Sequence, residues 1–427
     1  MKVVIMAGGR GTRVATLNPE LPKPMLNVCG KTILEYQIDC LKKNGLTDIL
    51  MIVGHKAPAI KDFFKDGSAF GCRITYYTEE IALGSGGALF KIQDQLPEDF
   101  ILLNGDIIFD VDFSRIIDFH KSKNALATLA AHPNSHPYDS ALLITDDEKR
   151  VIKWMNKEDK RYYAKNQVNS GIHILTKELL RITHPVEEKV DLDRFVLKPN
   201  LETGRIYAYN TPEYIKDMGT PERYAQVSAD IEKGLVTRKN LLVKQRAIFL
   251  DRDGTINQAN GFVCTAKDFV LIEGAASAIK KINQAGFLAI VITNQPVIAR
   301  GECTFAELEN IHNKMESTLG REGAYLDDIF FCPHHPQKGF AGEVPELKID
   351  CTCRKPSPGM ILQAAEKYNI DLTKSYMAGD SLRDIQAGIA AGCKSVFLES
   401  GVGTPKDLPA GTPVFPNLKD FINAIIV

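Results

Sequence analysis

The strongest constraint on the fold is an alternation of short apolar segments with helical patterns, which is typical of α/β proteins with parallel strands. The apolar segments have the length of buried strands, and they are Val3–Met6, Ile49–Val53, Ile101–Leu103, Ala247–Leu250, Leu288–Ile292 and Ser395–Leu398. After the first of them, Leu34, Ile38 and Leu41 lie on one face of a helix that stops near Asn44-Gly45. The sequence therefore predicts an α/β fold.

The same pattern starts a second time near residue 245. The preceding stretch, residues 231–240, is polar and has no clear periodicity. A chain of 427 residues is also too long for one ordinary core. We therefore predict two domains, covering residues 1–235 and 245–427, with the boundary between 232 and 245.

Composition narrows the class of protein. A hydrophobic content of 44% and a charged content of 25% are those of a soluble globular protein, and a net charge of −1 argues against nucleic-acid binding. No apolar run is long enough to span a bilayer, and the opening segment stops at Gly8-Gly9, too soon for a signal-peptide core. We expect a cytoplasmic protein that binds small molecules rather than nucleic acid or membrane. Its oligomeric state cannot be derived from the sequence.

A glycine-rich loop follows the first predicted strand. Gly8-Gly9-Arg10-Gly11-Thr12-Arg13 is succeeded by Pro22-Lys23-Pro24-Met25. Glycines let backbone N–H groups approach phosphate oxygens, and Arg13 and Lys23 would neutralise charge on a triphosphate. The dinucleotide fingerprint fails at Val14, and a lone glycine cluster is equally compatible with a plain tight turn.

Taken whole, this string resembles the signature of the sugar-phosphate nucleotidyltransferases, and the resemblance extends over the first half of the chain. It implies a mixed α/β sheet domain, with Arg13 and Lys23 as catalytic cations. The segment Glu80–Ala88 resembles the part of that family that contacts the nucleotide base. The nucleotide-binding residues implied in this way are Gly8, Gly9, Gly11, Thr12, Arg13, Glu80, Gly84 and Gly87.

Further motifs extend the resemblance to the sugar phosphate and to Mg²⁺. Asn169-Ser170-Gly171 and Glu188-Lys189 resemble the sugar and sugar-phosphate contacts of the family, implying Asn169, Gly171, Glu188 and Lys189. Asp106, after an apolar strand, and Asp217 resemble its metal aspartates, and carboxylates are ligands that Mg²⁺ prefers. Taken alone, either aspartate is better explained as an ordinary turn residue or helix cap, and only the surrounding string favours a metal role.

The second half begins with two carboxylates, Asp251 and Asp253, directly after a buried strand. Such a pair is costly unless a cation compensates it. In the context Phe-Leu-Asp-Arg-Asp-Gly-Thr it resembles the first motif of the haloacid-dehalogenase superfamily of phosphatases. That resemblance implies a Rossmann-like domain without a large cap. It makes Asp251 the nucleophile and Asp253 the general acid and base.

The remaining motifs of that superfamily follow in order. Thr293 ends a strand and would hold a phosphoryl oxygen, and Arg354 and Lys355 supply cations. Gly379-Asp380, followed by Asp384, resembles the fourth motif. By this resemblance Mg²⁺ is held by Asp251, the backbone carbonyl of Asp253 and Asp380. Taken singly, Thr293 could be only a strand-end residue and Arg354 only a surface cation, neither with a role in catalysis.

Three of the nine cysteines cluster with a histidine. Cys332, His334, Cys351 and Cys353 form a set of ligands that matches a closed, structural tetrahedral zinc site. His335 is a spare candidate that we do not favour. The alternatives are a disulfide or buried free thiols.

The position of this cluster, just before Arg354-Lys355-Pro356, resembles the heptose-bisphosphate phosphatases and their histidinol-phosphate relatives. It implies that Asn294, Arg300 and Arg354 bind the sugar phosphate. The chain departs from the heptose pattern at Pro296-Val297, Ser381 and Ala259-Asn260. These departures leave the anomer and the identity of the sugar open.

Together the two halves suggest consecutive steps. A heptose 1,7-bisphosphate 7-phosphatase makes heptose 1-phosphate, and a nucleotidyltransferase of the first type consumes it. We therefore expect a nucleotide-heptose enzyme that contributes to a surface polysaccharide, with GTP favoured by resemblance. Two alternatives remain: the phosphatase half acts on histidinol phosphate or another small phosphomonoester, or one half is a non-catalytic regulatory module.

Overall fold

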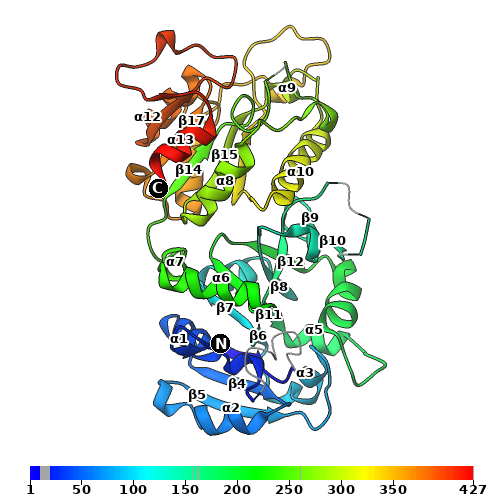
Figure 1. Cartoon of the computed structure of the whole chain (residues 1–427). Helices are drawn as coiled ribbons and strands as arrows, with labels where there is room; N and C mark the ends of the chain where they lie inside the picture. The colour runs from blue at the N-terminus through cyan, green and yellow to red at the C-terminus, as the bar shows by residue number, and fades with distance from the viewer. Residues whose placement is uncertain (10–19, 157, 161–162, 260, 427) are drawn as a thin grey trace. The chain divides into compact units, whose positions relative to one another are not determined.

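The computed structural model describes residues 1–9, 20–156, 158–160, 163–259 and 261–426. The chain forms two compact units, whose elements are labelled in Figure 1. Unit 1 comprises Met1–His132, Leu143–Met155 and Asn169–Asn240, and unit 2 comprises Pro133–Leu142, Asn156–Val168 and Leu241–Val427. The main division, after Asn240, falls between residues 232 and 245. Nothing in the sequence had indicated that two short segments of the first half belong to unit 2.

The sheet of unit 1 has parallel strands at its centre, in the order β6-β1-β4-β5. Strand β11 lies antiparallel to β6. Parallel strands β8 and β12 extend the sheet from β11, and two short strands, β2 and β3, form a separate hairpin. The bounds are β1 Lys2–Met6, β2 Asn27–Val28, β3 Lys31–Thr32, β4 Asp48–Val53, β5 Arg73–Thr78, β6 Asp99–Asn104, β7 Ile107–Asp110, β8 Ala127–His132, β9 Leu142–Thr145, β10 Val151–Met155, β11 Val168–Thr176, β12 Ile206–Asn210 and β13 Tyr214–Asp217.

Helices of unit 1 pack on this sheet through apolar faces. Leu34, Ile38 and Leu41 of α1 join the core that contains alternate residues of β1 and β4. Helix α1 begins at a capping box, in which Thr32 and Glu35 accept each other's backbone N–H. The bounds are α1 Ile33–Lys43, α2 Ala57–Phe64, α3 Gly87–Lys91, α4 Phe113–Ser122, α5 Lys177–Ile182, α6 Pro221–Glu232 and α7 Leu235–Arg238.

Unit 2 contains a parallel sheet in the order β16-β15-β14-β17-β18-β19. Its central strand β14 is buried on both faces, which explains its uninterrupted apolar run. The order reverses at β14, and in open α/β sheets ligands bind beyond the carboxyl ends of strands at such a point. The bounds are β14 Ala247–Leu250, β15 Leu288–Asn294, β16 Asp328–Cys332, β17 Tyr376–Gly379, β18 Lys394–Leu398 and β19 Val414–Phe415.

Helices cover both faces of the unit 2 sheet. One core packs Ile248 and Leu250 against α8, α10 and α13, and the other packs Ala247 and Phe249 against α11 and α12. The bounds are α8 Ala275–Gln284, α9 Pro296–Ala299, α10 Phe305–Arg321, α11 Gly359–Lys367, α12 Leu382–Ala391 and α13 Leu418–Ile425.

The prediction of a mixed α/β fold is confirmed, and each apolar segment named from the sequence overlaps a strand. The predicted helix stop is also found, since α1 ends at Lys43. Within the described part of the chain, no helix combines the length and apolar character needed to cross a membrane.

Candidate active sites

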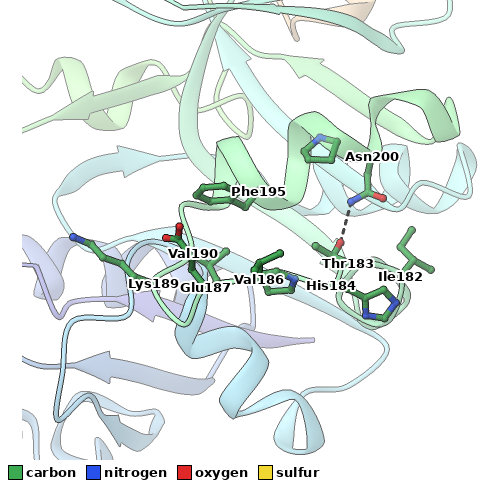
Figure 2. Close-up of a pocket in the computed structure, with 11 residues that line it drawn as sticks. Ile182, Thr183, His184, Val186, Glu187, Lys189, Val190, Phe195 and Asn200 are labelled. Carbon is green, nitrogen blue, oxygen red and sulfur yellow. Dashed lines mark hydrogen bonds between the residues drawn. The ribbon is translucent and has the colours of Figure 1, made fainter.

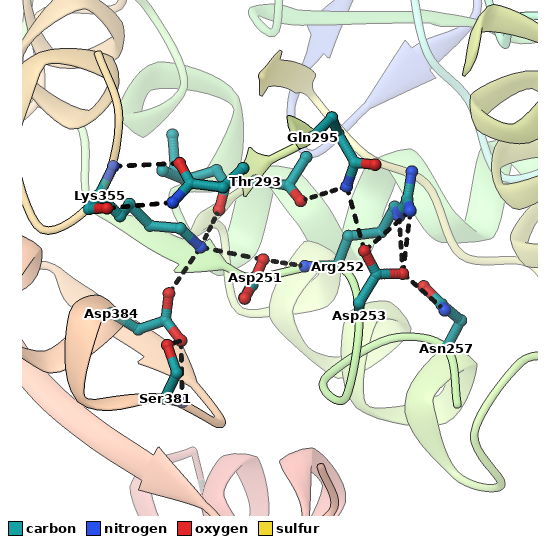
Figure 3. A network of polar contacts seen from close by, with 11 residues as sticks. Asp251, Arg252, Asp253, Asn257, Thr293, Gln295, Lys355, Ser381 and Asp384 are labelled. Atoms are coloured by element: carbon teal, nitrogen blue, oxygen red, sulfur yellow. Dashed lines mark hydrogen bonds and ion pairs between the residues drawn. The ribbon is translucent and has the colours of Figure 1, made fainter. Parts of the chain in front are cut away.

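The charged centre of unit 2 lies at the carboxyl ends of parallel strands. Asp251 follows β14, and its backbone N–H donates to Ala378 of β17. Lys355 extends its Nζ to within 2.9 Å of Asp251 Oδ1 and 2.5 Å of Asp384 Oδ1, and donates to the Ile292 carbonyl (Figure 3). The end of β14, the loop that carries Lys355 and the first turn of α12 thus bring together an acid, a cation and a second acid that are far apart in the sequence.

Burial shifts the pKa values of the charged groups in this centre. The side chain of Lys355 is 2% exposed and that of Asp384 is fully buried. Burial, reinforced by the neighbouring Asp384 carboxylate, raises the pKa of Asp251 to about 7. For Lys355, burial lowers the pKa, but Asp251 and Asp384 outweigh it and hold the pKa above its ordinary value.

Asp251, Asp380 and Asp384 offer carboxylate oxygens that all lie within 4.8 Å of one another. Three hard oxygen donors around one point are a set of ligands that suits Mg²⁺. Glycines make room for Asp380: a Cβ at Gly254 would lie 2.4 Å from its Oδ2, and one at Gly401 would lie 1.8 Å from the same atom. The residues therefore fit a divalent cation.

Asp253 has a different set of partners from Asp251. Arg252, whose side chain is fully buried, donates to both Asp253 oxygens at 2.8–3.1 Å. Asn257 and Gln295 donate to the same carboxylate at 2.9 and 3.0 Å. Burial would raise the pKa of Asp253, but the Arg252 guanidinium and the amide donors keep it below its ordinary value.

The loop that carries Arg354 and Lys355 is fixed to β15. Asn294 donates to the Lys355 carbonyl and accepts from the Lys355 N–H, both at 3.0 Å. Arg354 Nη1 donates to the carbonyl of His334 at 3.1 Å. Asn294, which the resemblance assigns to the sugar phosphate, uses its amide to hold this loop.

Arg300, also assigned to the sugar phosphate, lies between two aromatic rings. Its guanidinium carbon is 4.8 Å from the Phe262 ring centre and 4.6 Å from the Phe340 ring centre. His335, the spare zinc candidate, lies 3.4 Å from Arg300 Nη2. Stacking on these two rings therefore holds the Arg300 guanidinium in place.

The four predicted zinc ligands come together. Cys353 Sγ lies 3.2 Å from the sulfurs of Cys332 and Cys351, and 3.3 Å from His334 Nδ1. Tetrahedral bonds of about 2.3 Å place neighbouring ligand atoms roughly 3.8 Å apart, so this set is close to a metal-binding geometry. None of the chain's cysteines, all of which lie in the described residues, is in a disulfide.

Acids and cations also meet in unit 1. Lys23 lies 2.5 Å from Asp106, which follows β6, and the Asp106 carbonyl accepts the N–H of Met218 at 2.9 Å. Asp217 lies at the end of β13, and both of its carboxylate oxygens accept from Arg223 Nη1 at 2.8 Å. Burial raises the pKa of Asp217, but Arg223 and Lys23 outweigh it and bring the pKa below its ordinary value. Two carboxylates at this site suit Mg²⁺.

A close approach of two backbone segments explains why two of the predicted nucleotide-binding residues are glycines. A Cβ at Gly84 would lie 2.5 Å from the Val190 carbonyl, and one at Gly87 would lie 2.6 Å from the Glu188 carbonyl. The base segment and the sugar-phosphate segment therefore run side by side. Gly11, Thr12 and Arg13 lie outside the described residues.

Other predicted residues of unit 1 have different surroundings. Glu80 is exposed, whereas a Cβ at Gly8 would meet the Glu79 carboxylate. A Cβ at Gly171 would lie 2.5 Å from Asn104, so the Asn169-Ser170-Gly171 run reaches the end of β6. Asn169 itself pairs with His173 at 3.0 Å.

The two residues of the predicted pair Glu188-Lys189 have different surroundings. Glu188 pairs with Lys91 at 3.1 Å. Lys189 instead lines a cavity of about 450 Å³ with Glu187, His184 and Phe195 (Figure 2). Of the two predicted contacts, only Lys189 is therefore among the residues that line this cavity.

Comparisons with known proteins agree with both resemblances. A nucleotidyl transferase family model matches residues 2–234, and a haloacid-dehalogenase-like hydrolase model matches residues 352–421. The chain belongs to both families. The predictions of a nucleotidyltransferase and of a haloacid-dehalogenase-type hydrolase are confirmed.

Individual relatives are similar to one half each. The D-glycero-beta-D-manno-heptose-1,7-bisphosphate 7-phosphatase of Escherichia coli K12 is 42% identical over 174 residues, 41% of this chain and 84% of that protein. A mannose-1-phosphate guanylyltransferase of Mycobacterium tuberculosis is 32% identical over 236 residues, 54% of this chain and 65% of that protein. A crystal structure of D,D-heptose 1,7-bisphosphate phosphatase from B. bronchiseptica, complexed with magnesium and phosphate, is 36% identical, covers 42% of this chain and 98% of that one, and has a TM-score of 0.38.

Sequence reasoning missed several polar residues that shape the two sites. In the hydrolase, Gln295 contacts Asp253. Ser381, which the sequence marked only as a departure from the heptose pattern, donates to Asp384 at 2.6 Å. In the nucleotidyltransferase, the buried amide of Gln37 donates to the Asn104 and Ile107 carbonyls and so fixes the turn that carries Asp106. A glutamine on an otherwise apolar helix face was the available signal for Gln37.

Proposed function

We propose that this chain catalyses two consecutive steps toward a nucleotide-activated D-glycero-D-manno-heptose. The hydrolase would remove the 7-phosphate of the 1,7-bisphosphate, and the nucleotidyltransferase would act on the resulting heptose 1-phosphate. The observation that carries the proposal is the joining of the two families in one chain. A relative named for the heptose 7-phosphatase reaction matches one half, and the phosphate that this reaction leaves on the anomeric carbon is what a sugar-1-phosphate nucleotidyltransferase consumes.

In the proposed hydrolysis, an oxygen of Asp251 attacks phosphorus and the bond to the sugar oxygen breaks. Asp253 gives a proton to the departing oxygen, and later takes one from the water that hydrolyses the aspartyl phosphate. The ion pair of Lys355 with Asp251 supports a role in holding the nucleophile and balancing charge. Thr293 and Arg354 would contact phosphate oxygens, and Asn294 and Arg300 would contribute to binding the sugar phosphate.

We assign Mg²⁺ to the hydrolase centre and zinc to the thiolate cluster. Asp251, Asp380 and the Asp253 carbonyl would hold Mg²⁺, which when bound neutralises charge on the phosphoryl oxygens. The close approach of Asp384 to the same oxygens supports this cation site. Cys332, His334, Cys351 and Cys353 would hold a structural zinc, because three thiolates and an imidazole close a tetrahedral site.

In the proposed nucleotidyl transfer, a phosphate oxygen of heptose 1-phosphate attacks the α-phosphorus and pyrophosphate leaves. Arg13 and Lys23 would neutralise the triphosphate, and Asp106 and Asp217 would hold Mg²⁺. The nucleotide contacts would come from the glycine-rich loop, Gly84, Gly87 and Glu80, and the sugar contacts from Asn169, Gly171, Glu188 and Lys189. We favour GTP, because the mycobacterial relative is named a guanylyltransferase. We place both steps in the cytoplasm, where nucleoside triphosphates are made.

Product analysis tests the whole sequence of reactions. The intact chain, given heptose 1,7-bisphosphate, Mg²⁺ and each nucleoside triphosphate in turn, should release phosphate and pyrophosphate and form a nucleotide-heptose. Asp251→Asn should block the bisphosphate but still accept heptose 1-phosphate, and Asp106→Asn should stop at heptose 1-phosphate. A far higher kcat/KM for histidinol phosphate than for the bisphosphate would contradict the proposal. A half that is inactive on every substrate would be a regulatory module instead.

A further inference from the structure

Gln295 has a buried amide that joins two functional groups of the hydrolase. The residue follows β15, is 2% exposed, and is fixed by its backbone N–H, which donates to the Cys332 carbonyl at 2.8 Å. Its Nε2 donates to Asp253 Oδ2 at 3.0 Å and to Thr293 Oγ1 at 2.8 Å (Figure 3). Both hydrogens of one amide group therefore serve the site.

These two contacts have different consequences for their acceptors. A hydroxyl has one hydrogen to donate, and because Thr293 accepts from Gln295, its own hydrogen remains available for a phosphoryl oxygen. Asp253 is held from its other side by Arg252 and Asn257. Among the contacts described for Asp253, the one from Gln295 is the contact that also reaches Thr293. The amide thus sets the distance between the proton-carrying group and the phosphate-binding hydroxyl.

We propose that Gln295 is a positioning residue that aims Asp253 at the oxygen leaving the phosphorus. This inference rests on the proposed hydrolysis. In its first step the Asp251 oxygen forms a bond to phosphorus, the bond from phosphorus to the sugar oxygen breaks, and a proton brought by the phosphate monoanion passes through the Asp253 carboxylate to that oxygen. An alkoxide is a poor leaving group and needs this proton, whereas nitrophenolate leaves readily without it. The contribution of Gln295 therefore depends on the leaving group.

The experiment compares two substrates of one phosphoenzyme. Gln295→Met keeps the volume of the side chain but removes both donors. With heptose 1,7-bisphosphate, the single-turnover rate of phosphoenzyme formation should fall about 100-fold, since general acid catalysis contributes roughly 10²–10⁴-fold. With p-nitrophenyl phosphate, the burst of nitrophenolate should keep nearly the parent rate. KM for the bisphosphate should change little, because the amide aims a proton and does not bind the sugar.

Two further variants separate positioning from structure. Gln295→Glu keeps the shape but has no donor and adds a carboxylate beside Asp253, so it should show the same selective loss. Gln245→Met removes an amide that is also 2% exposed in unit 2 and donates to the Val243 carbonyl, outside the site. This control should behave alike on both substrates. If Gln295→Met fails to fold, as judged by circular dichroism, Gln295→Glu decides the question.

Equal losses on the two substrates, or a Gln295→Glu chain with the parent rate on the bisphosphate, would overturn the role of Gln295 and leave the proposed function standing. If the parent chain hydrolyses no alkyl phosphomonoester, the proposed hydrolysis fails and this inference fails with it.

Discussion

The two candidate sites use the same residue types in opposite physical settings. In the hydrolase, Lys355 and Asp384 have side chains exposed by 2% or less. In the nucleotidyltransferase, the side chains of Asp106 and Asp217 are 38% and 40% exposed. A buried set of charges is assembled before any substrate arrives, whereas half-exposed acids paired with lysine and arginine can exchange those partners for a metal and a polyphosphate. The first setting suits transfer of a single phosphoryl group, and the second suits a large substrate that brings its own charge.

Removing the proposed nucleophile should give the largest loss of activity at either site. Asp251→Asn should lower phosphate release by at least about 10⁴-fold, because the covalent route is lost. Nucleotidyl transfer by the same chain should stay near the parent rate. A coupled phosphate assay on the purified variant measures this, with the exposed Asp407→Asn as the matched control. Substantial phosphate release by a contaminant-free Asp251→Asn preparation would refute the assignment.

The half-exposed site should give a smaller loss. Asp106→Asn and Lys23→Ala should each lower nucleotidyl transfer by roughly 10²–10³-fold, since each removes charge arranged around the polyphosphate. Pyrophosphate release measures the effect, and the exposed Asp62→Asn is the control. If both variants make sugar nucleotide at the parent rate, the site has been misplaced.

A third change tests whether the hydrolase depends on its thiolate cluster. The parent should contain about one zinc per chain, and Cys351→Ser should lose it, because three ligands no longer close the tetrahedron. The melting temperature should fall, and phosphatase activity should drop about 10–100-fold, as is typical when support around a site is removed. Elemental analysis and calorimetry measure this, with the exposed thiol of Cys29→Ser as control. A Cys351→Ser chain with full zinc and normal activity would contradict the cluster.

The smallest expected effect concerns stability and pH. The pKa of Asp251, raised to about 7 by burial and Asp384, means that the metal-free folded state binds a proton more tightly than the unfolded state does. Stability therefore falls as the pH rises from the unfolded pKa near 4 through 7. In chelator at pH 8, Asp251→Asn should raise the melting temperature by roughly 2–4 °C per kcal/mol recovered. The gain should vanish near pH 4, and a gain independent of pH would refute the explanation.

The motifs at strand ends were predictable, because each lies in a short string whose chemistry is local. Asp251 follows an apolar strand and is accompanied by glycine and threonine, and the strand predicted before it has the bounds observed for β14. Lys355 was named from another local string, Arg354-Lys355-Pro356, and the structure places it beside Asp251. The sequence also indicated the four cluster residues, since thiolates and imidazole at such spacing are uncommon without a metal.

Contacts between distant segments were not predictable. Gln295 and Asp253 are 42 positions apart, and Gln37 and Asn104 are 67 apart. A glutamine has no local signature that distinguishes a surface amide from a buried one that fixes a turn, as Gln37 does. Gly84 shows the converse: a glycine interpreted as a nucleotide contact also has a purely steric reason for its lack of a side chain.

The glycines around Asp380 have a consequence for evolution. A side chain at Gly401 or Gly254 would overlap the Asp380 carboxylate, and one at Gly403 would lie 1.8 Å from its carbonyl oxygen. Even alanine is therefore excluded at these positions while Asp380 keeps its place. When a gene for such a hydrolase is duplicated and one copy drifts, loss of these glycines would mark decay even if every charged residue survives. In a mutational scan of the chain, these three glycine positions should tolerate substitution as poorly as Asp251 does.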